Sequence, residues 1–328
     1  TYILELKNGE KRTTLKSAND LVEEKQIWVS VNEDNLISRT LSDKQPRLSG
    51  TDAPVLIVGA STRDTLYLAA ENGDCAAIPV HALPETDKPS EGTPISKVSV
   101  LRPDQNLAAL FTLPNRSQSE ILDLYQSWYV LTVTRQGMVK KSLISDLPGA
   151  SAGSFTLVKV NDEDRLGWIK LSNGEDDILI QTANGMAIRF SENDVRPMGL
   201  VAAGVMGIKL QSEDTVVGVE IVPEKGEVFL IAENGYGKRI KTDQFPKQGR
   251  YGQGVQSWKL AQNIKVAGMV TGKGTDRAIV FLRKLAPKSI RLDSAPLQTR
   301  AARGKSVQEI KEGDLIISLT LPWTTPRP

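Results

Sequence analysis

The chain has 328 residues, 40% of them hydrophobic and 24% charged, so it is long enough to bury a large core. Its formal net charge of +2 does not by itself indicate a polyanionic partner. The single cysteine, Cys75, excludes an internal disulfide and favours a reducing cytoplasm over secretion. No apolar run approaches the roughly 18 residues of a membrane-spanning helix.

The first residues read as part of a longer chain. A strand is predicted at Tyr2–Leu6, followed by a turn and polar residues. The start lacks both an initiator Met and the basic-then-apolar order of a signal peptide. We therefore expect a linker at residues 1–20, a folded domain at 21–321 and a tail at 322–328.

From residue 21 onward, short β runs alternate with turns. The only helix candidate is Ser117–Leu124. The predicted strands are, in chain order, Ile27–Val31, Leu36–Leu41, Val55–Val58, Thr65–Ala69, Cys75–Val80, Val98–Leu101, Tyr129–Thr134, Met138–Leu143, Phe155–Val160, Asp177–Thr182, Met186–Phe190, Val205–Leu210, the strands on either side of Asn234-Gly235, Val255–Leu260, Ala278–Leu282, Ser289–Leu292, Val307–Ile310 and Leu315–Leu319.

A repeating unit underlies these strands. Each unit is a strand, a tight turn, a basic return strand, and a loop rich in proline and glycine that leads to another strand. The turn at Asn234-Gly235 is predicted to be type I′, and turns at Gln136-Gly137 and Asn184-Gly185 hold the corresponding places in their repeats. Their glycines are 48 and 50 residues apart. Four short strands in a repeat of this length are typical of a propeller-like ring; the alternative is two unrelated β-sandwiches.

Motifs for catalysis are nearly absent. His81 is the only histidine and Cys75 the only cysteine, too few for a clustered metal site. No glycine-framed serine and no phosphate-binding GxxxxGK[ST] loop occurs. We expect no catalytic, cofactor or metal site in this chain.

The distribution of charge is more informative than its sum. Between Lys238 and Lys305, sixteen Lys/Arg face three acids, a balance of +13 that leaves −11 for the rest of the chain. Such asymmetry is typical of a surface that binds a polyanion.

The basic residues also recur at corresponding places in the repeats. In a ring such places share one height, so they predict a basic belt around the outer rim that suits duplex DNA, whose phosphates are evenly spaced. On return strands the residues are Arg39, Lys140, Lys141, Arg189, Lys238, Arg239 and Arg291; on loops they are Lys44, Arg47, Lys88, Arg196, Lys247, Arg250, Arg300, Arg303 and Lys305.

Three segments carry a family resemblance. Glu233–Gly254 (ENGYGKRIKTDQFPKQGRYGQG), Val195–Leu210 (VRPMGLVAAGVMGIKL) and Thr182–Phe190 (TANGMAIRF) closely resemble the C-terminal domain of the A subunit of DNA gyrase, which is a type II topoisomerase; topoisomerase IV has a similar domain. The resemblance runs from about Asp20 to Leu319. Lys7–Leu21 looks like the linker that leaves the catalytic part of that subunit.

This resemblance implies an all-β fold, a six-bladed β-pinwheel of four-stranded blades that exchange strands. It implies sequence-independent binding and bending or wrapping of double-stranded DNA, in support of strand passage and supercoiling. Catalysis, ATP and Mg²⁺ belong to the rest of the A subunit or to the B subunit, which are the implied protein partners. A bacterial, nucleoid-associated cytoplasmic enzyme, no membrane contact and a monomeric isolated domain are further expectations.

The first loop departs from the family pattern. Gyrases resemble one another in a Q-R-R-G-G-K-G box, whereas Lys44–Gly50 reads KQPRLSG and keeps only part of it. This favours either a gyrase with a shifted DNA path or a topoisomerase IV-like domain that bends DNA without supercoiling. Phe155–Gly235 has seven Lys/Arg against fourteen acids, so DNA is expected to avoid that arc. A protein-interaction platform and a propeller enzyme with a central site are the rivals from other classes.

Overall fold

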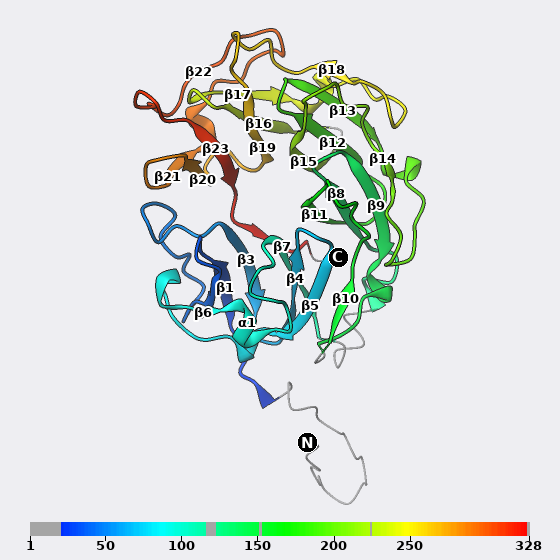
Figure 1. Cartoon of the computed structure of the whole chain (residues 1–328), viewed down its shortest axis with the longest axis vertical. Coiled ribbons are helices and arrows are strands. Elements are labelled where there is room, and N and C mark those ends of the chain that lie inside the picture. The colour runs from blue at the N-terminus through cyan, green and yellow to red at the C-terminus, as the bar shows by residue number, and fades with distance from the viewer. Residues whose placement is uncertain (1–20, 116–122, 151–152, 224, 327–328) are drawn as a thin grey trace, which may run out of the picture.

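The computed structural model describes residues 21–115, 123–150, 153–223 and 225–326. The predicted linker at 1–20 lies outside the described residues, as does most of the helix predicted at Ser117–Leu124. Six small sheets form a ring, which Figure 1 shows face-on. The predicted all-β, six-bladed architecture is confirmed. No helix among the described residues has the length and apolar character to cross a membrane.

Blades 1 to 3 contain the first half of the chain. Blade 1 has the strand order β24 (Trp323–Thr324), β3 (Leu56–Ser61), β1 (Gln26–Val31), β2 (Leu36–Arg39), β6 (Thr93–Pro94). Blade 2 has β10 (Ser154–Thr156), β5 (Asp74–Pro79), β4 (Asp64–Ala70), β7 (Leu107–Pro114). Blade 3 has β11 (Leu166–Ser172), β8 (Tyr129–Thr134), β9 (Met138–Leu143), β14 (Val205–Met206).

Blades 4 to 6 complete the ring. Blade 4 has β15 (Val216–Val222), β12 (Asp177–Thr182), β13 (Met186–Ser191), β18 (Val255–Gln256). Blade 5 has β19 (Val266–Thr271), β16 (Glu227–Ala232), β17 (Tyr236–Lys241), β22 (Lys305–Ser306). Blade 6 has only β21 (Lys288–Arg291), β20 (Arg277–Leu282) and β23 (Ile316–Thr320).

Helical structure in the described part of the chain is confined to short turns. One α-helical turn, α1 (Ile95–Val98), follows β6. Short 3₁₀ turns follow return strands or lie in their loops: η2 (Val80–Ala82), η3 (Pro89–Glu91), η4 (Ile144–Asp146), η5 (Glu192–Asp194), η6 (Thr242–Gln244) and η7 (Leu292–Ser294).

Neighbouring blades exchange their outermost strands. The loop after each of β5, β9, β13, β17 and β21 crosses the rim and pairs with the return strand of the preceding blade, as β18 does with β13 and β22 with β17. The strands predicted at Phe155–Val160, Val205–Leu210 and Val255–Leu260 are these short crossing strands, and they belong to the preceding blade.

The inner strands are the main elements missing from the prediction. Leu166–Ser172, Val216–Val222 and Val266–Thr271 line the middle of the ring, and none of these three strands was predicted from the sequence. The strand predicted at Val98–Leu101 is wrong, because the chain makes α1 there and the inner strand follows at Leu107–Pro114. The inner strands carry central glycines or mixed faces that hide the alternation expected of a half-buried strand.

Each hairpin turn is also the docking point of a crossing strand. The type I′ prediction is wrong: the N–H of Gly235 donates to the Ala232 carbonyl, and the positive φ of +80° belongs to Gly235, the fourth residue of the turn. Its carbonyl accepts the N–H groups of Val307 and Gln308 from the next repeat. A Cβ on Gly235 would lie 1.9 Å from the Gln308 carbonyl oxygen.

The same arrangement recurs at other hairpins. A Cβ on Gly73 would meet the Val158 carbonyl oxygen at 2.0 Å, and one on Gly185 the Trp258 carbonyl oxygen at 2.5 Å. The turn glycine and the later loop strand, which recur together in the sequence, are therefore two halves of one contact between blades.

The hydrophobic core is divided among the gaps between blades. One cluster of buried side chains joins blades 4 and 5, with Phe245 and Trp258 inside it. The cluster between blades 6 and 1 is smaller, with Ala53, Ile279 and Phe281 as its fully buried members. The joint between blades 6 and 1, here called the seam, thus has less buried apolar contact than the other joints described.

The seam also lacks an exchanged strand. Lys288 in blade 6 has the same register position as Lys238 in blade 5. Pro287 therefore corresponds to Gly237, the residue that pairs with Lys305 of the crossing strand in blade 5. Proline has no N–H to offer a crossing strand. One hydrogen bond replaces the strand, from the N–H of Gly50 to the Pro287 carbonyl, 2.9 Å.

The C-terminal segment closes the seam instead. β24 pairs in parallel with β3, and the Thr320 hydroxyl donates to the Val55 carbonyl. Beyond it, the Thr325 hydroxyl accepts from the Thr112 N–H at 3.2 Å, and the Tyr125 hydroxyl donates to the Pro326 carbonyl at 3.1 Å. Residues 322–326, predicted to be a tail, are part of the ring.

Substituting Gly235→Ala is expected to lower the free energy of unfolding by about 2–4 kcal/mol, because an alanine is strained at positive φ and its Cβ meets the crossing strand. Gly249→Ala is the control, since a Cβ there meets nothing within 4 Å. Urea denaturation of both variants measures the difference. Equal stabilities of the two variants would contradict the docking role of the turn glycine.

Candidate functional site

The outer rim is formed by the loops between return strands and crossing strands. These loops run over the 3₁₀ turns η5, η6 and η7 and end at glycines with positive φ: Gly204 at +94°, Gly254 at +77° and Gly304 at +80°. Each glycine is pressed against the preceding blade; a Cβ on Gly254 would lie 2.3 Å from the Ala187 carbonyl oxygen. The loops are therefore fixed at both ends, in two different blades.

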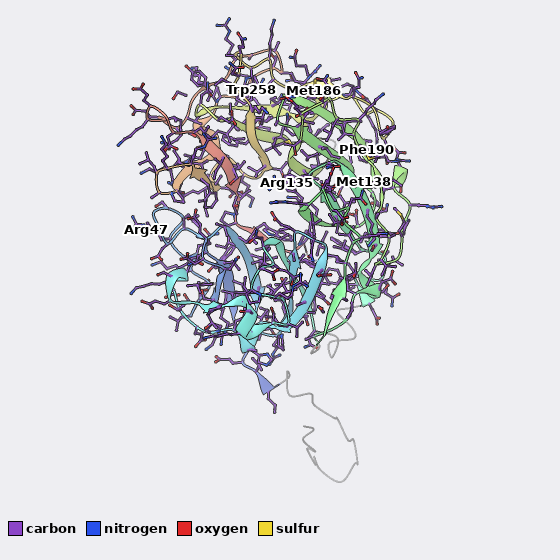
Figure 2. All side chains as sticks on the ribbon, viewed as in Figure 1. Arg47, Arg135, Met138, Met186, Phe190 and Trp258 are labelled. Atoms are coloured by element: carbon purple, nitrogen blue, oxygen red, sulfur yellow. The ribbon has the colours of Figure 1, made fainter. Side chains whose placement is uncertain are left out.

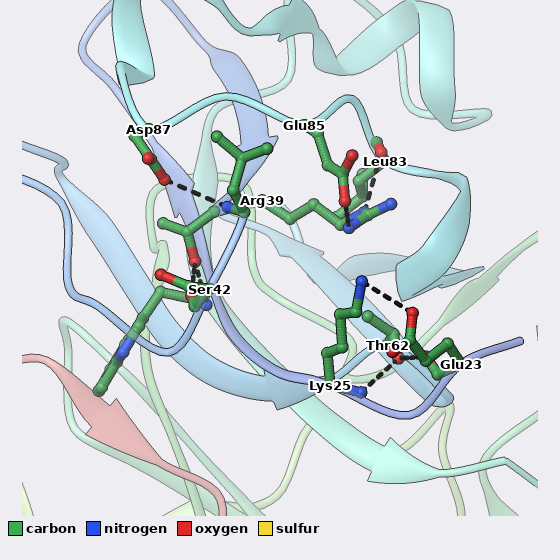
Figure 3. A network of polar contacts seen from close by, with 11 residues as sticks. Glu23, Lys25, Arg39, Ser42, Thr62, Leu83, Glu85 and Asp87 are labelled. Carbon is green, nitrogen blue, oxygen red and sulfur yellow. Dashed lines mark hydrogen bonds and ion pairs between the residues drawn. The ribbon is translucent and has the colours of Figure 1, made fainter.

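Four return-strand cations join neighbouring blades. Each donates to a backbone carbonyl at the 3₁₀ turn of the next blade, as Figure 3 shows for Arg39 and Leu83. The four bonds are Arg39 Nε to Leu83 O (3.2 Å), Lys141 Nζ to Glu192 O (2.9 Å), Arg189 Nη1 to Thr242 O (3.0 Å) and Arg239 Nε to Ala295 O (2.9 Å).

Carboxylates neutralise three of these cations. Arg189 pairs with Asp177 at 2.8 Å across β12 and β13 of blade 4. Arg239 pairs with Glu227 at 2.7 Å across the equivalent strands of blade 5, β16 and β17. Arg39 pairs with Glu85 at 2.5 Å. Arg189 and Asp177 are both buried, and Asp177 also pairs with Lys247 at 2.6 Å. Removing the Asp177 carboxylate would therefore leave the charge of Arg189 unpaired and out of water.

Lys140 and Lys238 are enclosed by loops. The Lys238 ammonium lies within 3.3 Å of the carbonyl oxygens of Ser257, Thr299, Arg300 and Ala302 and 4.9 Å from the centre of the Trp258 ring. The Lys140 ammonium donates to Leu157 and Leu200. Each lysine thus holds its own repeat's crossing segment and the next repeat's loop together.

Burial changes the proton affinity of these two lysines. It lowers the pKa of Lys238 from 10.5 to about 7, and the positive charge of Arg300 acts in the same direction. Burial also lowers the pKa of Lys140, to about 8, although the charge of Asp146 opposes the shift.

The expected basic belt therefore needs correction. Its placement on the solvent-facing rim is wrong for Lys140, Lys141, Arg189 and Lys238, which are buried, because crossing strands cover the return strands that carry them. Arg39, Arg239 and Arg300 are half-buried. In blade 6 the register position of Arg239 is occupied by Ser289, not by Arg291. The guanidinium of Arg291 pairs with Asp293.

The loop cations are on the surface. Exposed side chains at the rim are Lys44, Arg47, Lys88, Arg196, Lys247, Arg250, Arg291, Arg303 and Lys305, and Figure 2 shows Arg47 at the edge of the disc. Arg250 donates to the Met206 carbonyl at 2.9 Å, and Arg300 at the corresponding position donates to Gln256 at 2.8 Å. These bonds fix each arginine stem and leave part of its guanidinium open to solvent.

A second row of cations was not among the predicted site residues. Lys159, Lys209 and Lys259 are exposed, are 50 residues apart, and each lies three residues after the end of a crossing strand. The N–H groups of Lys159 and Lys209 donate to carbonyls of the next loop, Ala202 and Gly252, so both lie beside that loop. Their spacing was a readable signal, but it falls outside the return strands and loops on which the prediction concentrated.

The middle of the ring is mainly apolar. A cavity of about 520 Å³ is lined by the inner strands, including Leu110, Trp168 and Met269. The charged residues of its lining are Glu71, Arg135 and the ion pair of Lys170 and Glu220 at 2.8 Å. Among the described residues, no three His, Cys, Asp or Glu side chains group as metal ligands.

Comparison with known proteins assigns the family. A model of the DNA gyrase C-terminal domain, beta-propeller, matches residues 129–170, 176–223, 226–269 and 288–321, just over half of the chain. The chain belongs to the DNA gyrase A C-terminal domain family.

The relatives are longer proteins. The DNA gyrase A subunit of Staphylococcus epidermidis is 28% identical over 229 residues, which are 64% of this chain and 25% of that protein. The corresponding protein of Klebsiella oxytoca is 30% identical over 165 residues, 50% of this chain and 18% of that protein. The chain therefore spans about a quarter or less of these relatives.

Two solved structures share the fold of this gyrase-family domain. The C-terminal domain of DNA topoisomerase IV has a TM-score of 0.77 at 23% identity, over 92% of this chain and 94% of that one. The DNA gyrase A C-terminal domain has a TM-score of 0.72 at 21% identity, over 91% and 100%.

The buried lysine predicts a pH dependence of stability. Lys238 loses its proton near pH 7 when folded and near 10.5 when unfolded, so the unfolded state binds more protons between these values. Stability contributed by this group therefore rises with pH from about 7 to about 10.5. Urea denaturation of the unsubstituted chain and of Lys238→Met across this range measures it.

The unfolding free energy of the unsubstituted chain minus that of Lys238→Met is expected to rise with pH, because Met cannot titrate. Lys140 is present in both proteins, so the effect of its own titration cancels in this difference. A difference that stays constant would mean that the four carbonyl oxygens keep the Lys238 ammonium charged throughout.

Proposed function

We propose that this domain binds and bends double-stranded DNA along its outer rim without reading its sequence. The observation that carries the proposal is the regular row of exposed cations at Lys159, Lys209 and Lys259 beside loops that present further cations. Repeats in a ring place such side chains at one height. Evenly spaced phosphates can then be contacted blade by blade.

The loops suit close approach of a phosphate backbone. Arg250 and Arg300 are anchored on carbonyls of the crossing strands, so their charged groups are held in place before binding. Gly249 and Gly199 leave the loop backbone uncovered, since a Cβ at either meets nothing within 4 Å. Uncovered N–H groups beside fixed cations favour anions.

The charge distribution indicates which part of the rim the proposed DNA path is centred on. The +13 balance between Lys238 and Lys305 lies mainly on blades 5 and 6, while the arc from Phe155 to Gly235, which is acidic in sum but contains Lys159 and Lys209, lies mainly on blades 3 and 4. The proposed path meets that arc only at these two lysines. Bending 20–30 base pairs by 40–90° costs roughly 1–6 kcal/mol. Contacts from several blades are needed to offset that cost, so the basic arc is the proposed centre of the bend.

The wider role follows from the family. We propose that the domain presents bent DNA to the rest of a gyrase A subunit, together with its B subunit, in an ATP- and Mg²⁺-dependent bacterial cytoplasmic enzyme that passes strands and supercoils DNA. The domain itself is proposed to have no cofactor or catalytic group and to be a monomer. The shared family assignment supports this proposal.

A bending role without supercoiling is the second candidate. The loop that holds the incomplete box is four residues shorter than its counterparts, with Gly50 eleven positions after Arg39 but Gly254 fifteen after Arg239. A shorter loop offers less rim contact at blade 1. Supercoiling of relaxed plasmid by the reconstituted enzyme separates the two candidates.

Replacing Lys159, Lys209 and Lys259 together by Gln is expected to flatten the salt dependence of duplex binding, with the log–log slope becoming shallower by roughly 2 to 3, since each phosphate contact contributes about 0.9. Fluorescence anisotropy over a salt titration measures the slope.

The control replaces Lys265, Lys273 and Lys311 by Gln, which removes the same charge from exposed positions flanking the inner strands. Its slope is expected to stay within one contact of the unsubstituted chain. Equal losses in both triple variants would contradict a path along the rim. Absence of binding by the unsubstituted chain at low salt would overturn DNA binding itself.

A further inference from the structure

The cavity at the middle of the ring has the size and lining of a small-molecule site. The inner strands of all the blades contribute to its wall, namely β3, β7, β11, β15, β19 and β23, and the C-terminal segment completes it with Trp323 and Pro326. Its volume of about 520 Å³ lies within the range of roughly 300–1,000 Å³ that is typical of ligand pockets. The proposed path of DNA along the outer rim makes no use of this cavity.

Apolar side chains of the cavity wall are incompletely covered by the protein. Ile317 in β23 is 53% exposed, and Leu56, Val217 and Leu319 are half-buried. All four line the cavity, so an apolar occupant would take part of their surface out of water. The removal of apolar surface from water favours binding.

Arg135 places a guanidinium at the wall of the cavity. It is the first residue of the turn after β8 and lies near the centre of the ring, as Figure 2 shows. Its guanidinium carbon is 5.4 Å from the centre of the Trp168 ring. Among the residues that the structure describes, no hydrogen bond or ion pair engages this guanidinium.

The other charged groups of the wall have partners. Lys170 pairs with Glu220 at 2.8 Å. Glu71 pairs at 3.5 Å with Arg165, which is outside the lining. Each of these pairs has no net charge, so in the described lining the uncompensated charge is that of Arg135.

The stem of Arg135 is held against the neighbouring inner strand. The Cβ position of Gly167 lies 3.5 Å from the Arg135 Cγ, so the arginine stem packs on β11 where that strand has no side chain. Trp168, the next residue, lies under the guanidinium. A guanidinium over an aromatic ring keeps its N–H groups free, and its planar fork of donors matches the two oxygens of a carboxylate.

We propose that the central cavity binds a small amphipathic carboxylate, with the carboxylate on Arg135 and an apolar body against the inner strands. The charge of Arg135 selects an anion over a neutral apolar molecule. Binding there does not depend on DNA, because the cavity is separate from the rim. The lining includes β3, β23 and Trp323, so such a ligand contacts both sides of the seam and the segment that closes it.

The test is isothermal titration calorimetry of the 328-residue chain with octanoate and with 1-octanol, which has the same chain length and no charge. One saturable octanoate site is expected. Arg135→Gln is expected to weaken octanoate binding by about tenfold or more, because a hydrogen-bonded charge pair is lost, and to leave 1-octanol binding unchanged.

The matched control is Arg283→Gln. Arg283 holds the corresponding hairpin position in blade 6, since its N–H donates to Leu315 as that of Arg135 donates to Arg165. It is exposed but does not line the cavity, so its replacement is expected to leave octanoate affinity unchanged. Thermal unfolding of each variant without ligand checks that the ring is intact.

A second variant places the ligand in the cavity independently of Arg135. Ile317→Trp adds volume at an exposed position of the cavity wall and is expected to weaken binding of both octanoate and 1-octanol. Octanoate affinity that is equal in the unsubstituted chain and in Arg135→Gln would overturn the proposal, as would unchanged affinity in Ile317→Trp. Absence of saturable octanoate binding by the unsubstituted chain would overturn it as well, and would leave the proposed DNA binding untouched.

Discussion

The ring depends on the close contact between a hairpin glycine of one blade and the crossing strand of the next. Gly235 must have no side chain, because the Gln308 carbonyl occupies the space of a Cβ, and it must adopt a positive φ to end the hairpin. Both demands fall on one residue. This contact places the loops on the rim and brings each return strand under cover, which decides which of its cations meet solvent.

The covering strand gives the same residue type two different roles. Where a loop crosses, as over Lys140 and Lys238, the ammonium becomes an internal tie whose charge is opposed by burial. Where no loop crosses, as at Lys288, the charge stays in water. A lysine-rich return strand is therefore weak evidence for ligand contact until its outer neighbour is known.

The sequence predicted the ring, its period and most hairpin strands, because turn glycines and alternating β runs are local signals. It did not reveal the inner strands, since Gly167, Gly218 and Gly268 interrupt their pattern. Nor could it show that Arg189 and Lys238 are buried, because their cover comes from loops more than fifty residues away. The 50-residue spacing of Lys159, Lys209 and Lys259 is visible in the sequence, but these lysines belong neither to the return strands nor to the rim loops.

Because each rim loop is anchored in two blades, a force applied to the loop acts on both of them. The loop that carries Lys247 and Arg250 leaves blade 5 through β17 and enters blade 4 through β18. A force on the tip of this loop is carried by both sheets and acts on the interface between blades 4 and 5. Tension along the rim is therefore passed from blade to blade around the disc, and at the seam it falls on the Gly50–Pro287 bond and the C-terminal strand.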